Sequence, residues 1–161
     1  MKFDPIEEAH RQWVDRGWGD ASWMASATAF MRVQQIILKR VDASLRPHKL
    51  TFARYEALAL LCFSRRGSLP LGKMGDRLMV HPASVTNAVD RLEADGFVRR
   101  VRHPTDRRAV LAEITPAGRQ VVEKATKVLV SIRFGLAEFT EDEALESFGL
   151  IRALRERAGD F

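Results

Sequence analysis

Hydrophobic residues recur at helical spacing along most of this chain, which predicts a largely helical protein. The longest stretch covers residues 21 to 45, where Val33, Ile37 and Val41 fall on one helix face. Pro47 ends this stretch, because proline cannot continue a helix. Further helices are predicted at residues 5 to 17, 51 to 63, 71 to 78, 82 to 95, 116 to 139 and from 140 onward.

The spacing changes to two between residues 97 and 114, where apolar residues such as Val98 and Val110 alternate with polar ones. This pattern predicts a two-stranded hairpin whose turn is His-Pro-Thr-Asp. Residues 64 to 70, with the sequence SRRGSLP, are predicted to form a turn-rich break. Thr115 stands at a cap position and opens the next helix. The chain is therefore predicted to be mainly α with one small β-hairpin.

The order helix, turn, helix and basic hairpin spans residues 71 to 115 and is typical of proteins that bind double-stranded DNA. Helix 82 to 95 is predicted to bury Val85, Val89 and Leu92. Its other faces carry polar side chains that can hydrogen-bond base edges or phosphates. The candidate contact residues on this helix are Ser84, Thr86, Asn87 and Arg91. Taken by itself, the helix fits an ordinary surface helix equally well.

The hairpin favours the DNA-binding interpretation, because its arginines greatly outnumber its acidic residues. The arginines are Arg99, Arg100, Arg102, Arg107 and Arg108, opposed by Asp106. A tip of this composition cannot be buried, and arginine at a tip can enter the minor groove of DNA. His103 lies in the same turn and joins Asp106, Arg107 and Arg108 as a candidate DNA contact. The alternative is a solvated basic loop.

Charge and composition agree with a DNA-binding protein but do not establish one. The chain has 161 residues, a formal net charge of +5 and a sequence pI of about 9.9, which suit a polyanionic partner. A basic enzyme or a ribosome-associated protein would have the same balance. No apolar run is long enough to span a membrane, the start lacks a signal-peptide core, and Cys62 is the single cysteine. A cytoplasmic protein without internal disulfides is therefore expected.

Several motifs between residues 50 and 120 resemble the winged-helix regulators of the MarR family. They are Asp90-Arg91-Leu92-Glu93 with Gly96, then Arg99-Arg100, Asp106-Arg107-Arg108, and the run from Leu111 through Ile114-Thr115 to Gly118. The resemblance implies a winged helix-turn-helix fold with long N- and C-terminal dimerisation helices. It also implies that Ser84, Thr86 and Asn87 occupy recognition-helix positions, with Asp106 and Arg108 at the wing tip.

The N-terminal section is similar to the urate-responsive branch of that family. The similar segments are RQWVDRGWGD, MRVQQIILKRVD and FARYEAL. The resemblance implies a pocket for a small anion such as urate, citrate or trans-aconitate. It would use Trp13 and Trp18 with Arg91 and Arg100, and Glu56 as its acidic residue. Arginines beside an aromatic cluster suit such a ligand, since arginine binds carboxylates with two hydrogen bonds. The alternative is that these tryptophans are packing residues.

The predicted division of the chain has three parts. Residues 1 to 49 are the extra and dimerisation helices, 50 to 115 the winged helix-turn-helix domain, and 116 to 161 the C-terminal dimerisation helices. The apolar stripe of Leu145, Phe148, Ile151 and Leu154 is expected to form the homodimer surface together with the long helix at 21 to 45. Packing within one chain is the alternative. A two-fold dimer would bind an inverted repeat, and repression is the family's usual mode.

The residues also bear on two other classes of function, an enzyme or metal-binding protein and a DNA-architecture protein. The four histidines lack helical metal-site spacing, there is no cysteine pair, and no glycine-rich phosphate loop or nucleophile motif occurs. The chain is thus expected to be neither an enzyme nor a cofactor-binding protein, and Cys62 in LALLCF is expected to be an unreactive core residue. A DNA-architecture protein that binds without sequence preference and without an effector stays open.

Overall fold

The computed structural model describes residues 3–103, 105 and 109–161, and its chain divides into two compact units, Met1–Arg40 and Val41–Phe161. The first unit holds helix α1 (Pro5–Asp15) and most of helix α2 (Ser22–Leu45), which continues into the second unit. The Asp4 carboxylate accepts a hydrogen bond of 2.8 Å from the Ile6 N–H and caps α1. Asp20 accepts an equivalent bond of 2.8 Å from the Ser22 N–H at the start of α2.

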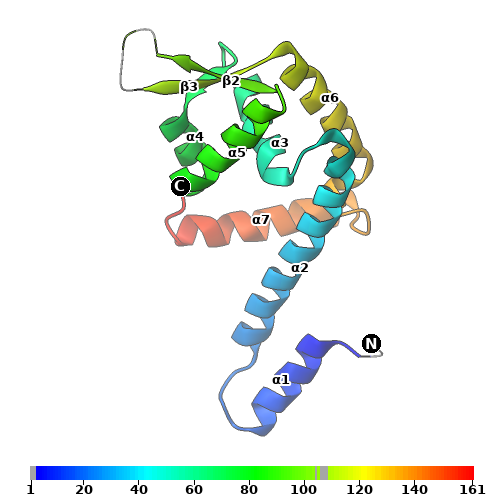
Figure 1. The fold of residues 1–161 in the computed structure, drawn as a ribbon. Coiled ribbons are helices and arrows are strands. Elements are labelled where there is room, and N and C mark those ends of the chain that lie inside the picture. The colour runs from blue at the N-terminus through cyan, green and yellow to red at the C-terminus, as the bar shows by residue number, and fades with distance from the viewer. Residues whose placement is uncertain (1–2, 104, 106–108) are drawn as a thin grey trace. The chain divides into compact units, whose positions relative to one another are not determined.

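The second unit contains the predicted helices and hairpin in the expected order, together with a further short strand and two 3₁₀ turns (Figure 1). They are η1 (Arg46–His48), α3 (Phe52–Phe63), β1 (Ser68–Pro70), α4 (Leu71–Leu78), α5 (Pro82–Ala94), β2 (Val98–Arg102), β3 (Val110–Ile114), α6 (Pro116–Ser131), η2 (Arg133–Gly135) and α7 (Glu141–Arg157). The prediction of a mainly helical winged helix-turn-helix fold is confirmed. Within the described residues, no helix combines the length and apolar character needed to cross a bilayer.

The sheet has three antiparallel strands in the order β1-β3-β2, so the prediction of a plain hairpin missed a strand. Strand β1 lies in the segment SRRGSLP, which we expected to be a turn-rich break, and Leu69 pairs with Ala112 of β3. Three residues between Gly67 and a helix carry no visible alternation, so pairing rather than local preference makes this a strand. Pro70 is tolerated because β1 is an edge strand.

The hydrophobic core of the second unit lies where α3, α4, α5 and α6 pack together with the sheet. The predicted inward residues of α5 are confirmed, because Val85, Val89 and Leu92 are no more than 2% exposed. Leu58, Met74 and Leu129 join them from α3, α4 and α6. Each such side chain contributes on the order of 1.5–3 kcal/mol through burial, and together they hold α5 with its polar face outward.

One junction ties the end of α5, the start of β2 and the start of α6 together. The Thr115 hydroxyl lies 2.8 Å from the Gly96 carbonyl oxygen and accepts a 3.0 Å hydrogen bond from the Gly118 N–H. The cap predicted at Thr115 is therefore confirmed. Gly118 is required for close approach, since a Cβ there would lie 2.1 Å from the Phe97 carbonyl oxygen. Gly96 has a φ of 75°, the left-handed conformation that commonly follows the end of a helix.

Helix α6 is shorter than predicted. It ends at Ser131, whereas the sequence pattern suggested a helix as far as residue 139. Arg133, Phe134 and Gly135 then adopt successive positive φ values of 48°, 51° and 83°, which no α-helix can contain. Apolar spacing continues through this turn, so periodicity alone could not locate the break. Thr140 caps the next helix and forms a capping box with Glu143.

Helix α7 differs from the helices of the core, because none of its residues is buried. Its large apolar side chains are exposed, and they are Leu145, Phe148, Leu150, Ile151 and Leu154. The capping box and the acidic first turn of Glu141, Asp142 and Glu143 favour the helix locally. Local preference therefore explains why α7 is a helix. Its apolar face stays exposed to solvent within the second unit.

Candidate nucleic-acid interface

A tight turn between α4 and α5 sets the position of the candidate recognition helix. Met79 ends α4 in the left-handed conformation with a φ of 55°, and the Val80 N–H donates a 3.2 Å hydrogen bond to the Gly75 carbonyl. His81 then caps α5 through its Nδ1, which accepts a 3.2 Å bond from the Ala83 N–H. Pro82 occupies the first helical position, where its missing N–H costs nothing. These local bonds begin α5 immediately after the turn.

The outer face of α5 carries the side chains that the sequence assigned to DNA contact. Ser84, Thr86, Asn87 and Arg91 are all exposed. The Thr86 hydroxyl donates a 3.1 Å hydrogen bond to the Pro82 carbonyl, which orients it along the helix. The exposed polar face thus stands directly opposite the buried face of Val85, Val89 and Leu92.

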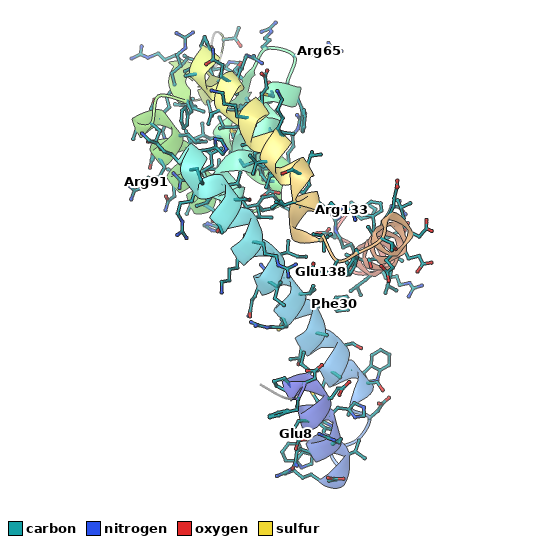
Figure 2. The ribbon with its side chains drawn as sticks, turned by 90° about the vertical axis from the view of Figure 1, so that its right-hand side faces the viewer. Glu8, Phe30, Arg65, Arg91, Arg133 and Glu138 are labelled. Atoms are coloured by element: carbon teal, nitrogen blue, oxygen red, sulfur yellow. The ribbon has the colours of Figure 1, made fainter. Side chains whose placement is uncertain are left out.

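Two shallow grooves flank this face of α5. The first, of about 510 Å³, is lined by Thr51, Ala53, Arg54, Ser84, Asn87, Ala88 and Arg91. The second, of about 650 Å³, is lined by Ala83, Thr86, Asn87, Asp90, Arg91 and Ala94. Asn87 and Arg91 line both grooves, so they form the ridge between them, and Figure 2 shows Arg91 at the outer edge of the second unit. A raised helix edge of this kind suits the major groove of DNA.

Sequence reasoning missed Arg54, which lines the first groove from α3. Its guanidinium lies 3.7 Å from the Asp95 carboxylate just after α5, so the two helices are joined by an ion pair. In the sequence Arg54 is simply the third residue after Thr51, whose side chain caps α3 by accepting a hydrogen bond from the Arg54 N–H. Nothing in the local pattern indicated the pairing with a residue 41 positions further on.

The two arginines at the base of the wing have different partners. Arg99 pairs with Glu113 across the β2–β3 ladder. Arg100 reaches out of the sheet to two carboxylates of α5, those of Asp90 and Glu93. The Arg100 N–H also donates a 2.8 Å hydrogen bond to Glu93, and this bond, followed by the guanidinium contact, lowers the pKa of the Glu93 carboxyl. Arg100 was predicted to bind a ligand, and in this structure its guanidinium pairs with these two carboxylates.

The outer wing is only partly described. His103 is half-buried, and its N–H donates a 3.2 Å hydrogen bond to the Ala109 carbonyl, which extends the β2–β3 ladder by one step. Asp106, Arg107 and Arg108 lie outside the described residues. Their predicted contact with DNA, and that of His103, stay predictions.

The tryptophans of the first unit form a local cluster. The Trp13 indole N–H donates a 3.1 Å hydrogen bond to the Trp18 carbonyl, and the two rings meet edge to face with centroids 5.3 Å apart. The Arg16 guanidinium lies 5.7 Å from the centroid of the Trp18 ring, which gives a cation–π contact. Trp18 is nevertheless exposed, as is Trp23. The cluster stabilises the turn between α1 and α2 and still presents aromatic surface beside a cation.

The remaining predicted ligand residues belong to the second unit. Arg91 lines the two grooves beside α5. Glu56 on α3 is half-buried, and burial raises the pKa of its carboxyl. The roles of Trp13, Trp18, Glu56, Arg91 and Arg100 toward a ligand stay predictions. Among the residues that the structure describes, no group of three or more His, Cys, Asp or Glu gathers as a metal site. The Cys62 thiol is half-buried, and burial raises its pKa.

Comparison with known proteins agrees with this geometry. A family model described as "MarR family" matches residues 53–110. The uncharacterized HTH-type transcriptional regulator YhbI of Bacillus subtilis is 31% identical over 121 residues, covering 75% of each chain. The crystal structure of Sco5413, a MarR family transcriptional regulator from Streptomyces coelicolor, is 54% identical with a TM-score of 0.79, over 86% of this chain and 96% of that one.

Sco3205, another MarR family regulator from Streptomyces coelicolor, was solved in complex with DNA and shows the same fold with a TM-score of 0.77. At 22% identity, over 88% of this chain and 89% of that one, this likeness concerns the fold alone. The helix-turn-helix with its three-stranded wing, the polar outer face of α5 and the similarity to YhbI and Sco5413 lead to one assignment. The chain belongs to the MarR family of transcriptional regulators.

Proposed function

We propose that this protein is a repressor that binds an inverted-repeat operator as a homodimer and is released by a small anionic ligand. The observation that carries the proposal is the ridge of Asn87 and Arg91 along the outer face of α5. An asparagine side chain can bind adenine with two hydrogen bonds, and an arginine can bind guanine or a phosphate in the same way. The buried face of the same helix fixes the direction in which these side chains point.

The homodimer is supported by the exposed apolar face of α7. Leu145, Phe148, Ile151 and Leu154 lie at helical spacing and are each at least 41% exposed. A contiguous apolar face of this kind on a folded chain marks an interaction surface. A second copy related by a two-fold axis would cover it and place two α5 helices on half-sites about one helical turn apart, roughly 34 Å. The operator would then be an inverted repeat.

Release by an anion is supported by the aromatic surface of Trp13 and Trp18 beside Arg16. From the resemblance to the urate-responsive branch, we propose urate, citrate or trans-aconitate as the ligand. Each can be titrated while tryptophan fluorescence and DNA release are followed together. We expect one of them to change both signals over the same concentration range. If none does, the branch assignment fails while the DNA-binding proposal stands.

Footprinting on the promoter beside the protein's own gene tests the DNA-binding proposal. A regulator should protect one inverted repeat and prefer it to random DNA by about 10³-fold or more. A DNA-architecture protein would bind both sequences within about tenfold. The second result would replace the regulator by that alternative.

Two matched arginine variants test whether α5 makes the contact with operator DNA. Arg91→Ala should cost about 1–3 kcal/mol of operator binding, because it removes a direct contact from α5. Arg65→Ala removes the same charge from the opposite edge of the second unit (Figure 2) and should change affinity by less than about threefold at 0.15 M salt. Asn87→Ala should relax base preference at one position of each half-site. Equal losses from both arginine variants would contradict the assignment of α5 as the recognition helix.

A further inference from the structure

Arg100 is the one residue of β2 that makes ion pairs with α5 in the described part of the chain. One guanidinium nitrogen lies 2.5 Å from the Asp90 carboxylate, and the other contacts Glu93. The Arg100 backbone N–H adds a 2.8 Å hydrogen bond to Glu93. Asp90 and Glu93 are three residues apart, so both carboxylates lie on the same face of α5. A single side chain thereby connects the wing to two positions about one turn apart on the helix.

The neighbouring Arg99 provides a contrast on the same strand. Successive side chains of a strand point to opposite faces, so Arg99 and Arg100 leave β2 in different directions. Arg99 stays within the hairpin, where its partner Glu113 stands opposite it in the β2–β3 register. Its side chain is 66% exposed, against 27% for Arg100. Two adjacent arginines of equal charge therefore hold different parts of the molecule together.

The contacts of Arg100 restrain the angle between α5 and β2, which apolar packing alone defines less well. Val89 and Leu92 of α5 and Val98 of β2 are buried in the same core, and apolar contacts of this kind are not directional. The planar guanidinium is directional, because its N–H groups point along fixed lines. A lysine would offer a single point charge in its place. The pKa of Glu93 is lowered by its bonds to Arg100, so the pair stays ionised.

The charge balance of this cluster argues against a direct DNA contact. One guanidinium faces two carboxylates, which leaves a net formal charge of −1 at the base of the wing. Within the described residues, the charge of Arg100 is therefore balanced by protein groups, unlike that of the neighbouring exposed Arg91. Arg100 therefore has a partner set suited to holding protein elements together.

We infer that Arg100 is a positioning residue, which fixes the angle between α5 and the wing and through that angle the sequence preference of DNA binding. The inference rests on the proposed function, because it requires α5 and the wing to contact one DNA site together. Asp90 and Glu93, which hold the Arg100 guanidinium, share this positioning role. Removing either side of the cluster should have the same effect on sequence preference, although the two changes alter the net charge in opposite directions.

The test compares three variants of the full-length protein. They are Arg100→Gln, the double variant Asp90→Asn/Glu93→Gln, and the control Arg99→Gln. Each is titrated with a duplex selected by the wild-type protein from a random pool and with a scrambled duplex of the same length. Arg100→Gln and Asp90→Asn/Glu93→Gln should each lose about tenfold in the ratio of the two affinities, as contacts coupled in one network do. Arg99→Gln should weaken both duplexes equally and keep the ratio.

Hydroxyl-radical footprints and thermal melting separate positioning from a general loss of stability. In both cluster variants, protection beneath the wing should shift or fade while protection beneath α5 remains. A variant that melts earlier yet keeps the wild-type ratio and footprint would overturn the inference. So would an Asp90→Asn/Glu93→Gln protein that binds the selected duplex more tightly with its preference intact. A wild-type protein that binds the selected and scrambled duplexes equally well would instead overturn the proposed function and this inference with it.

Discussion

Helices α5 and α7 have the same kind of amphipathic sequence and opposite surroundings. The apolar side chains Val85, Val89 and Leu92 of α5 are buried, with Leu92 at 0% exposure, whereas Phe148 of α7 is 63% exposed. Both helices have capped starts, His81 for α5 and Thr140 for α7. The difference therefore lies in what covers each helix and not in its local chemistry. The apolar residues of α5 are covered by other parts of the same chain, whereas those of α7 are left exposed by it.

This contrast assigns different tasks to the two regions. The core around α5 has to hold a fixed orientation so that a polar face stays presented to solvent. The face of α7 is apolar and exposed in the single chain, and in the proposed dimer it is the surface that a second copy would bury. Substitutions in the two regions should consequently change different measurable quantities, which gives three tests of the comparison.

The largest expected effect is on stability, from Leu92→Ala in α5. The side chain is fully buried, so its truncation leaves a cavity and should lower the free energy of unfolding by about 2–5 kcal/mol. Urea denaturation at fixed protein concentration measures the loss. Leu154→Ala in α7 is the matched control, with both substitutions made in the Phe148→Asp background so that the proposed dimer does not cover Leu154, which is 55% exposed in the single chain. Equal losses within one folded chain would break the comparison.

A smaller effect is expected on assembly, from Phe148→Asp in α7. A charge in the middle of the apolar face should weaken the proposed dimer by about 2 kcal/mol or more, as at the centre of other interfaces. Sedimentation velocity over a range of concentrations should show a shift toward the monomer mass. The helical circular dichroism signal of the monomer should remain. An unchanged dimer mass would show that this face is covered in some other way.

The smallest expected effect is on the pH dependence of stability, from the half-buried Glu56 of α3. Burial raises the pKa of its carboxyl above the ordinary value, so the folded protein binds the proton more tightly than the unfolded chain. The stabilisation is fully present below the unfolded pKa and is lost as the pH rises through the folded pKa. Glu56→Gln should therefore become more stable than the wild type as the pH rises across that window, in urea titrations from pH 4 to 7.

Exposed Glu146→Gln in α7 is the control for this pH dependence. A wild-type protein that gains stability over Glu56→Gln toward neutral pH would contradict the assigned cause, because it would mean that the folded state favours the Glu56 carboxylate.

Much of the winged helix could be predicted because its signals are local. Thr51, Thr115 and Thr140 cap helices through bonds to residues three positions away, and such spacing is visible in the sequence. The exposed positions of Ser84, Thr86, Asn87 and Arg91 follow from the periodicity of a single helix. These features need no knowledge of how the chain folds back on itself.

The features that the sequence did not reveal depend on distant partners. Strand β1 exists because Leu69 meets Ala112, and the roles of Arg99 and Arg100 divide according to strand register and packing. The break after α6 rests on left-handed residues such as Phe134, a type that rarely adopts this conformation. Whether the predicted tryptophan cluster binds a ligand is likewise a question that its local contacts do not decide.

The junction at Thr115 and Gly118 bears on how far apart two operator half-sites can be. Helix α6 begins at this point, and it can approach the Phe97 carbonyl only because residue 118 has no side chain. Any larger residue would tilt or lift α6 away from the end of α5. In a two-fold assembly, that tilt would be repeated on both sides of the axis and would change the separation of the two recognition helices. The absence of a single methyl group thus helps to define the length of DNA that the proposed dimer can match.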